Sequence, residues 1–215
     1  MRTDTAFLAL AVGYAGASEC LCVFDVDRTL TGKQGSAPSG ACPADREVSG
    51  VRDSAYGGGT LTLSALAQGI NGTFCNDCWL GVCSAGSASG TGSDEQKFLL
   101  ASVLGGPNRV GNATSWSSGI PATSPLVVCQ PDGKKQDAVK SIVDWYATVA
   151  KIVIAPSDVY FFDDRADNVK PFAGTGFNAH QISCASRDAS KLGQVGLCGA
   201  TVDEITRAKG IGSCS

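Results

Sequence analysis

The feature of this chain that most constrains its fold is an alternation of short apolar runs with segments of helical periodicity. Apolar runs of about 4–8 residues are typical of buried strands, and apolar residues three or four positions apart are typical of amphipathic helices. We expect strands within residues 19–24, 78–83, 126–129, 158–162 and 177–183, and helices within 60–68, 93–104 and 134–151. Strands that alternate with helices predict an α/β fold, a Rossmann-like parallel sheet with helices on both faces.

The length and composition of the chain favour one domain. Its 215 residues are 43% hydrophobic, which is enough for a single sizeable core. The formal net charge of -3 provides no global basic field, so we expect no binding to nucleic acid or to an anionic membrane surface. We therefore expect one domain over residues 18–215, with an irregular insert rich in Gly, Ser and Pro at 31–58.

Residues 1–17 have the pattern of a secretory signal peptide. Arg2 supplies a weakly basic start, residues 6–14 are apolar, and residues 15–17 are small, as at a cleavage site. Asp4 is unusual in such a leader, and a buried N-terminal helix is the alternative. No apolar run of eighteen or more residues follows, so we expect no membrane span in a mature, secreted chain.

The 10 cysteines all follow the predicted cleavage site and favour export. An even, high count after a signal peptide indicates disulfide bonds formed in an oxidising compartment. Cys75 and Cys78 precede a strand, and no second pair has the spacing of a zinc site, so structural disulfides are expected. The pairing cannot be deduced from spacing, and Cys184–Cys198 is the one pair that we suggest. Two sequons for N-glycosylation add to this pattern: Asn71-Gly72-Thr73 and Asn112-Ala113-Thr114.

Polar residues follow four of the predicted strands at the points where the strands end. They are Asp25, Asp27 and Thr29 after the first, Ser84, Ala85 and Gly86 after the second, Lys134 and Lys135 after the third, and Asp163 and Asp164 after the fourth. Ligands of open α/β sheets bind outside the carboxyl ends of the strands. Each group alone would also fit a turn, a solvated helix start or a helix cap. All four together predict a catalytic site at one edge of the sheet.

These groups resemble the four sequence motifs of the haloacid dehalogenase superfamily, and within it those of the phosphatases. The stretch DVDRTLT at 25–31 is similar to the first motif, Asp-x-Asp-x-Thr after an apolar strand. LGVCSAG at 80–86 is similar to the second, Lys135 to the third, and VYFFDDRADN at 159–168 to the fourth. The resemblance covers residues 20–183. The first and fourth motifs are specific, and the order of all four makes the resemblance strong.

The resemblance implies a phosphatase that works through a covalent intermediate. Asp25 would be the nucleophile that forms an aspartyl-phosphate, and Asp27 the general acid and base. Positions i and i+2 of a strand share a face, so both carboxyl groups can approach one phosphate. The implied phosphate-binding residues are Thr29, Ser84, Ala85, Gly86 and Lys135, with Lys134 as the alternative to Lys135. An Asp at position 27 points to phosphate esters rather than to carbon–halogen bonds.

The resemblance also implies Mg²⁺, which prefers oxygen ligands. The implied ligands are Asp25, the backbone carbonyl of Asp27, and Asp164, with Asp163 as a second ligand or an outer support. The motif often carries a further acid four residues on. Counting from Asp163 gives Asp167, whereas counting from Asp164 gives Asn168, so both acids stay candidates for direct contact, and we favour Asp164.

The short insert after the first motif indicates a capless or minimally capped enzyme. An open site of this kind would accept an extracellular phosphorylated protein or a small phosphate ester. Two other functions stay open: a secreted binding or surface protein without turnover, and a phosphomutase or phosphotransferase. His180, the single histidine, is expected to be structural.

Overall fold

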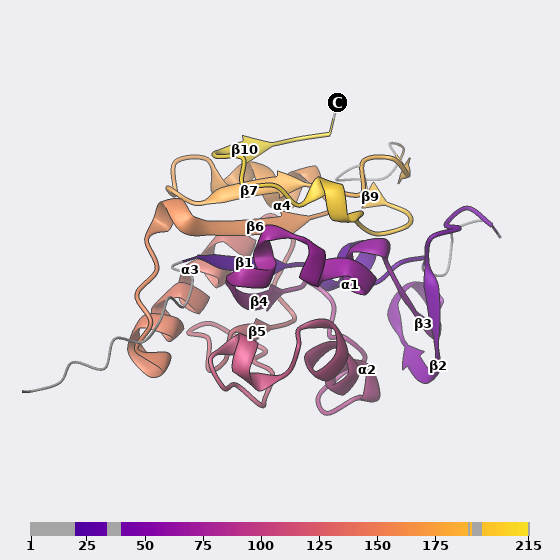
Figure 1. Ribbon diagram of the computed structural model, residues 1–215, viewed down its shortest axis with the longest axis horizontal. Coiled ribbons are helices and arrows are strands. Elements are labelled where there is room, and N and C mark those ends of the chain that lie inside the picture. The colour runs from indigo at the N-terminus through magenta and orange to yellow at the C-terminus, as the bar shows by residue number, and fades with distance from the viewer. Residues whose placement is uncertain (1–19, 34–39, 189, 191–194, 215) are drawn as a thin grey trace, which may run out of the picture.

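The computed structural model describes residues 20–33, 40–188, 190 and 195–214, so the predicted signal peptide lies outside the described residues. Its larger sheet has six strands in the order β10-β7-β6-β1-β4-β5 (Figure 1). The strands are β1 (Leu21–Phe24), β4 (Trp79–Cys83), β5 (Leu126–Val127), β6 (Val159–Asp163), β7 (Asn178–Gln181) and β10 (Ile211–Gly212). Every neighbouring pair is parallel. Taken along the chain, this is the doubly wound order 3-2-1-4-5-6. The predicted α/β fold with a Rossmann-like sheet is confirmed.

Helices lie on both faces of this sheet. They are α1 (Ala65–Gly69), α2 (Asp94–Phe98), α3 (Lys135–Trp145) and α4 (Ala166–Val169). Shorter helical segments span Val26–Leu30, Ala55–Gly57, Ile70–Gly72, Phe74–Asp77, Leu99–Val103, Pro107–Val110, Tyr146–Ala150, Pro156–Asp158, Lys170–Phe172 and Val202–Glu204. Phe161 of β6 stacks on Phe172, just after α4, with ring centroids 4.7 Å apart. Its neighbour Tyr160 points to the opposite face and packs against Phe74, in the segment after α1, with ring centroids 4.9 Å apart.

The insert at 31–58, expected to be irregular, contains most of a β-hairpin. Strand β2 (Arg46–Asp53) pairs antiparallel with β3 (Gly59–Leu63), beside the main sheet at the right of Figure 1. The helix expected within 60–68 is therefore wrong in its first half. Alternating Thr and Leu have a period of two, which fits a strand. The helix α1 begins only after Ser64, whose side chain accepts a hydrogen bond from the backbone N–H of Ala67.

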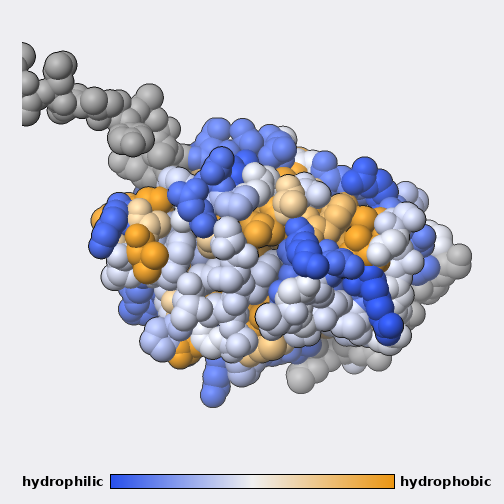
Figure 2. Space-filling view, turned by 90° about the horizontal axis from the view of Figure 1, so that it is seen from below, coloured by the Kyte–Doolittle hydropathy of each residue, from blue (hydrophilic) through white to orange (hydrophobic). Residues whose placement is uncertain are grey.

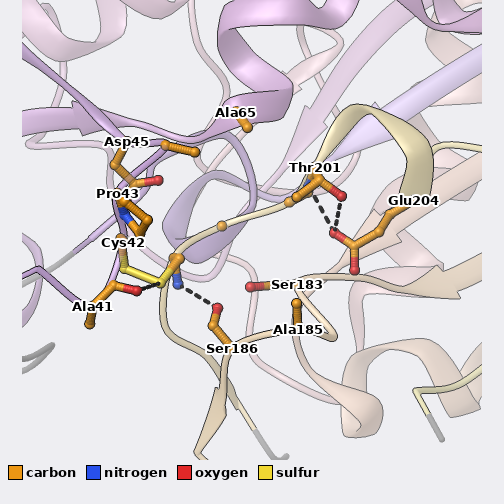
Figure 3. A pocket seen from close by; sticks show the side chains of 14 residues that line it. Ala41, Cys42, Pro43, Asp45, Ala65, Ser183, Ala185, Ser186, Thr201 and Glu204 are labelled. Atoms are coloured by element: carbon orange, nitrogen blue, oxygen red, sulfur yellow. Dashed lines mark hydrogen bonds between the residues drawn. A yellow bond between two sulfur atoms is a disulfide. The ribbon is translucent and has the colours of Figure 1, made fainter.

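Four disulfide bonds join distant parts of the chain: Cys20–Cys78, Cys22–Cys75, Cys42–Cys198 and Cys184–Cys214. The suggested Cys184–Cys198 pair is wrong, because Cys198 pairs with the insert and Cys184 with the C-terminal segment. Figure 3 shows the Cys42–Cys198 bond in the wall of a cavity of about 210 Å³. Cys83 and Cys129 carry free thiols. A small second hairpin, β8 (Arg187–Asp188) with β9 (Val195–Gly196), precedes Cys198.

The described part of the chain carries few large exposed apolar side chains. They are Tyr56, Ile120, Val149, Val153 and Ile211. Figure 2 views the molecule from the side of β5 and α2, where hydrophobic residues lie in small groups among hydrophilic ones. None of the described helices combines the length and the apolar character needed to cross a bilayer.

Candidate active site

The carboxyl ends of β1 and β6 lie side by side in the middle of the sheet, where the strand order reverses. This reversal is the usual ligand-binding position of doubly wound sheets. Phe24 of β1 is in register with Phe162 of β6, and the backbone N–H of Asp25 donates to the Phe162 carbonyl at 2.9 Å. The pairing of the two strands therefore places Asp25 beside Asp163.

A buried acidic cluster forms at this point. Carboxylate oxygens of Asp25, Asp163 and Asp164 lie within 4.8 Å of one another, and all three residues are buried. Lys135, at the start of α3, places its Nζ 2.9 Å from Asp25 Oδ1 and 2.7 Å from Asp163 Oδ2. One ammonium group thus contacts two of the three carboxyl groups, with Asp164 beside them.

The two neighbouring acids have different surroundings. Asp163 accepts hydrogen bonds from Lys135 and from Asn168, whose Nδ2 lies 3.1 Å from each carboxylate oxygen. Asp164 lines the open cleft, and its Oδ2 accepts a hydrogen bond of 2.7 Å from the backbone N–H of Gly196. Asp163 therefore supports the cluster from inside the core, whereas Asp164 faces the cleft.

Burial dominates the ionisation of this cluster. It raises the pKa of Asp25 to about 7, against the lowering effect of Lys135. Burial, together with the nearby charges of Asp163 and Asp25, raises the pKa of Asp164 well above its ordinary value. Burial would lower the pKa of Lys135, but the two acids outweigh it and raise that pKa. The cluster holds more acidic groups than its single cation can balance, and its hard oxygen donors suit a divalent cation. Asp25, Asp163 and Asp164 can therefore hold a metal ion.

These pKa directions give a testable dependence of stability on pH. In metal-free protein the folded state keeps protons on Asp25 and Asp164 that the unfolded chain releases above about pH 4. Their contribution to the free energy of unfolding is present below pH 4 and is lost as pH rises through their folded-state pKa values. Mg²⁺ at about 100 times its Kd should add about 2.7 kcal/mol to the free energy of unfolding at pH 7.5.

The measurement is thermal unfolding between pH 5 and 8, with and without Mg²⁺. Asp164→Asn serves as the comparison, because its amide oxygen can still accept from Gly196. The variant should be less sensitive to pH and to Mg²⁺ than the wild type. Other titrating groups cancel in this difference, so identical profiles would contradict the assignment.

A cleft of about 330 Å³ opens above the acidic cluster. It is lined by Asp25, Asp27, Ala55, Tyr56, Ala85, Gly86, Asp132, Asp164 and Arg165. The turn after β4 approaches the acids closely, because a Cβ on Gly86 would lie 2.4 Å from Asp27 Oδ2. Five of the residues predicted for the site, Asp25, Asp27, Ala85, Gly86 and Asp164, therefore line one cleft.

The other predicted residues are placed differently. Ser84 and Thr29 are buried, and among the described atoms their hydroxyl oxygens have no hydrogen-bond partner. Ser84 directly precedes the cleft wall, whereas Thr29 is not among the residues that line the cleft. Of the two lysines, Lys135 reaches the acidic cluster, and Lys134 is exposed just before α3.

Two residues of the site, Arg165 and Tyr56, carry no signal in the sequence pattern. Arg165 contacts Asp167 Oδ2 at 2.7 Å and Asp132 Oδ2 at 3.5 Å on the rim of the cleft. Asp167 is thus engaged outside the acidic cluster, and Asn168 is the residue that reaches Asp163. Tyr56 comes from the hairpin, in a stretch expected to be irregular.

His180 lies away from this chemistry. Its ring stacks on Phe162 with centroids 5.8 Å apart, and Nε2 lies 2.9 Å from the backbone oxygen of Ala208. These contacts are consistent with the structural role expected for it.

The chain matches no protein-family model and no curated protein. The fold and the site alone define its class: a disulfide-stabilised, doubly wound α/β protein with a buried aspartate cluster and one lysine at the point of strand reversal.

Proposed function

We propose that this protein is a Mg²⁺-dependent hydrolase of phosphate monoesters, similar to the phosphatases of the haloacid dehalogenase superfamily. The observation that carries the proposal is the buried Lys135 between Asp25 and Asp163, with Asp164 beside them. A carboxylate is a poor nucleophile toward an anionic ester unless positive charge lies next to it. The cluster provides a carboxylate, a fixed cation and further oxygen ligands at one point.

The reaction takes two displacements at phosphorus. A carboxylate oxygen of Asp25 forms a bond to phosphorus while the bond from phosphorus to the ester oxygen breaks, and Asp27 gives its proton to that oxygen. Water then attacks phosphorus, Asp27 takes a proton from the water, and the bond to Asp25 breaks. Inorganic phosphate leaves, and both carboxyl groups return to their starting states.

Other residues of the chain bind and orient the phosphoryl group. Lys135 holds Asp25 in place through the contact at 2.9 Å and offsets negative charge. The buried Ser84 hydroxyl, which lacks a partner among the described atoms, is available to donate to a phosphoryl oxygen. Gly86 approaches Asp27 closely, and the amides of the Ala85–Gly86 turn can donate as well. Bound Mg²⁺ would add positive charge beside the phosphoryl oxygens.

We also propose that the protein acts outside the cell. Its four disulfide bonds fit an extracellular protein. Asn71 and Asn112, the acceptors of the two sequons, are both exposed. The substrate would then be an extracellular phosphorylated protein or a small phosphate ester.

The test is hydrolysis of 4-nitrophenyl phosphate by the purified protein. Mg²⁺ should support turnover, and EDTA should reduce the rate by about 100-fold or more, because a bound metal contributes several kcal/mol of charge stabilisation. EDTA already saturated with Mg²⁺ is the control. A rate indifferent to EDTA would refute the mechanism. Binding of phosphate or beryllofluoride without turnover on a broad panel of esters would instead identify a non-catalytic binding protein.

A further inference from the structure

The hairpin places one aromatic side chain in the wall of the cleft. Tyr56 lies between β2 and β3 and lines the cleft together with Asp25 and Asp27. It is 48% exposed and is the one aromatic residue among the large exposed apolar side chains of the described part of the chain. An exposed ring at this position is available to a substrate.

A neighbouring arginine holds Tyr56 in place. The Arg28 guanidinium lies 3.9 Å from the centre of the Tyr56 ring. Arg28 is buried, and it follows Asp27 directly. This cation–π contact fixes the ring relative to the acids and covers one of its faces. The same surroundings affect the Tyr56 hydroxyl. Burial raises the pKa of Tyr56 to about 12; the nearby acids also raise it, and Arg28 lowers it.

The chain before Tyr56 is anchored to the core. The backbone N–H of Ala55 donates to Asp53 Oδ1 at 2.7 Å, and that of Ser54 donates to Ser89 Oγ at 2.9 Å. The Ser89 hydroxyl in turn bonds to the buried Glu95 of α2. These contacts fix the position at which the hairpin turns over the cleft.

Another part of the cleft lining carries little side-chain bulk. The Ala85–Gly86 turn contributes only one methyl group, and the close approach of Asp27 Oδ2 leaves no room for a Cβ at Gly86. Tyr56 itself has φ 49°, a left-handed conformation that is rare for a residue with a Cβ. Strained residues of this kind concentrate at functional sites. The cleft thus combines an aromatic surface with a wall of small residues beside the acids.

We propose that Tyr56 is a specificity-determining residue that favours aryl phosphates, monoesters whose leaving group carries a planar ring next to the ester oxygen. This inference rests on the proposed function. The leaving group of a phosphate bound at Asp25 lies on the Asp27 side, and the ring of Tyr56 offers it a stacking surface. A polyol leaving group has no planar face and gains nothing from that surface.

The test compares phenyl phosphate with glycerol 3-phosphate on the wild type and three variants. Tyr56→Asn removes the ring with a residue that tolerates the left-handed conformation. It should lower kcat/KM for phenyl phosphate by about 5- to 10-fold, whereas kcat/KM for glycerol 3-phosphate should stay within about 2-fold of the wild-type value. Tyr56→Phe keeps the ring and should retain the selectivity of the wild type. Val153→Asn, an equally drastic change at an exposed position outside the cleft, should change neither value.

The quantity compared is the ratio of kcat/KM for the two esters. Comparing this ratio between variant and wild type removes the difference in intrinsic reactivity of the esters and any general loss of active protein. Equal losses on both esters in Tyr56→Asn would refute the role of Tyr56 and leave the proposed function intact. A wild type that hydrolyses neither ester, nor 4-nitrophenyl phosphate, would refute the proposed function and this inference with it.

Discussion

Replacing Asp25 with asparagine should reduce hydrolysis by about 10⁴-fold or more, because a carboxamide cannot form the phosphoryl–enzyme bond. The same change should not weaken the fold. Burial already raises the pKa of Asp25 to about 7, so the folded state tolerates a neutral group there better than a charged one. Above pH 7 and without metal, the variant should unfold at a temperature equal to or higher than that of the wild type.

This combination of lost activity and retained stability distinguishes a nucleophile from a residue that only supports the core. The measurements are kcat with 4-nitrophenyl phosphate and thermal unfolding of the same samples. Asp144→Asn is the matched control, since Asp144 is an exposed carboxyl group paired with Lys140 on the surface of α3. It should change neither quantity. Substantial turnover by Asp25→Asn would rule out Asp25 as the nucleophile.

Replacing Lys135 with methionine should have the largest effect on stability. Methionine is of similar length but carries no charge. The Lys135 side chain is 1% exposed and contacts two buried carboxyl groups, which the change leaves without their cation. Removing one partner of a buried ion pair costs about 3–5 kcal/mol. The loss should be greatest at neutral pH without Mg²⁺, and smaller at pH 5, where the acids take up protons.

The neighbouring residue provides the control. Lys134→Met makes the same chemical change at an exposed position just before α3, and its cost should stay within about 0.5 kcal/mol. Urea unfolding at pH 5 and pH 7.5 measures both variants. Similar costs for the two lysines would show that Lys135 does not hold the acids together.

The parallel sheet could be predicted because its strands are buried on both faces. Val159 to Phe162 form an uninterrupted apolar run that is fully buried in β6. The hairpin could not be predicted, because β2 is largely exposed and its sequence, REVSGVRD, contains few apolar residues and a glycine. Strand β10 is also absent from the prediction, since a two-residue strand has no periodicity to recognise.

Within the site, the residues that follow a strand directly were predictable. Asp25 and Asp163 meet because β1 and β6 pair in register, which follows from the doubly wound order. Tyr56 was not predictable, because its place depends on the geometry of the hairpin. The spacing from Asp164 led to Asn168, but it did not show that Asn168 donates to Asp163. The disulfide pairs could not be predicted either, because spacing along the chain does not report distance in space.

The position of β1 has a consequence for how the protein forms during synthesis. Strand β1, which precedes both of its partners in the chain, ends up in the middle of the sheet, between β4 and β6. Val159, the partner of Leu21, lies far along the chain. The edge of β1 that pairs with β6 therefore stays unpaired until most of the polypeptide has been made. Meanwhile the Cys20–Cys78 and Cys22–Cys75 bonds can fasten it to the segment before β4. These two bonds would thus hold an unpaired strand edge in place before the acidic cluster is complete.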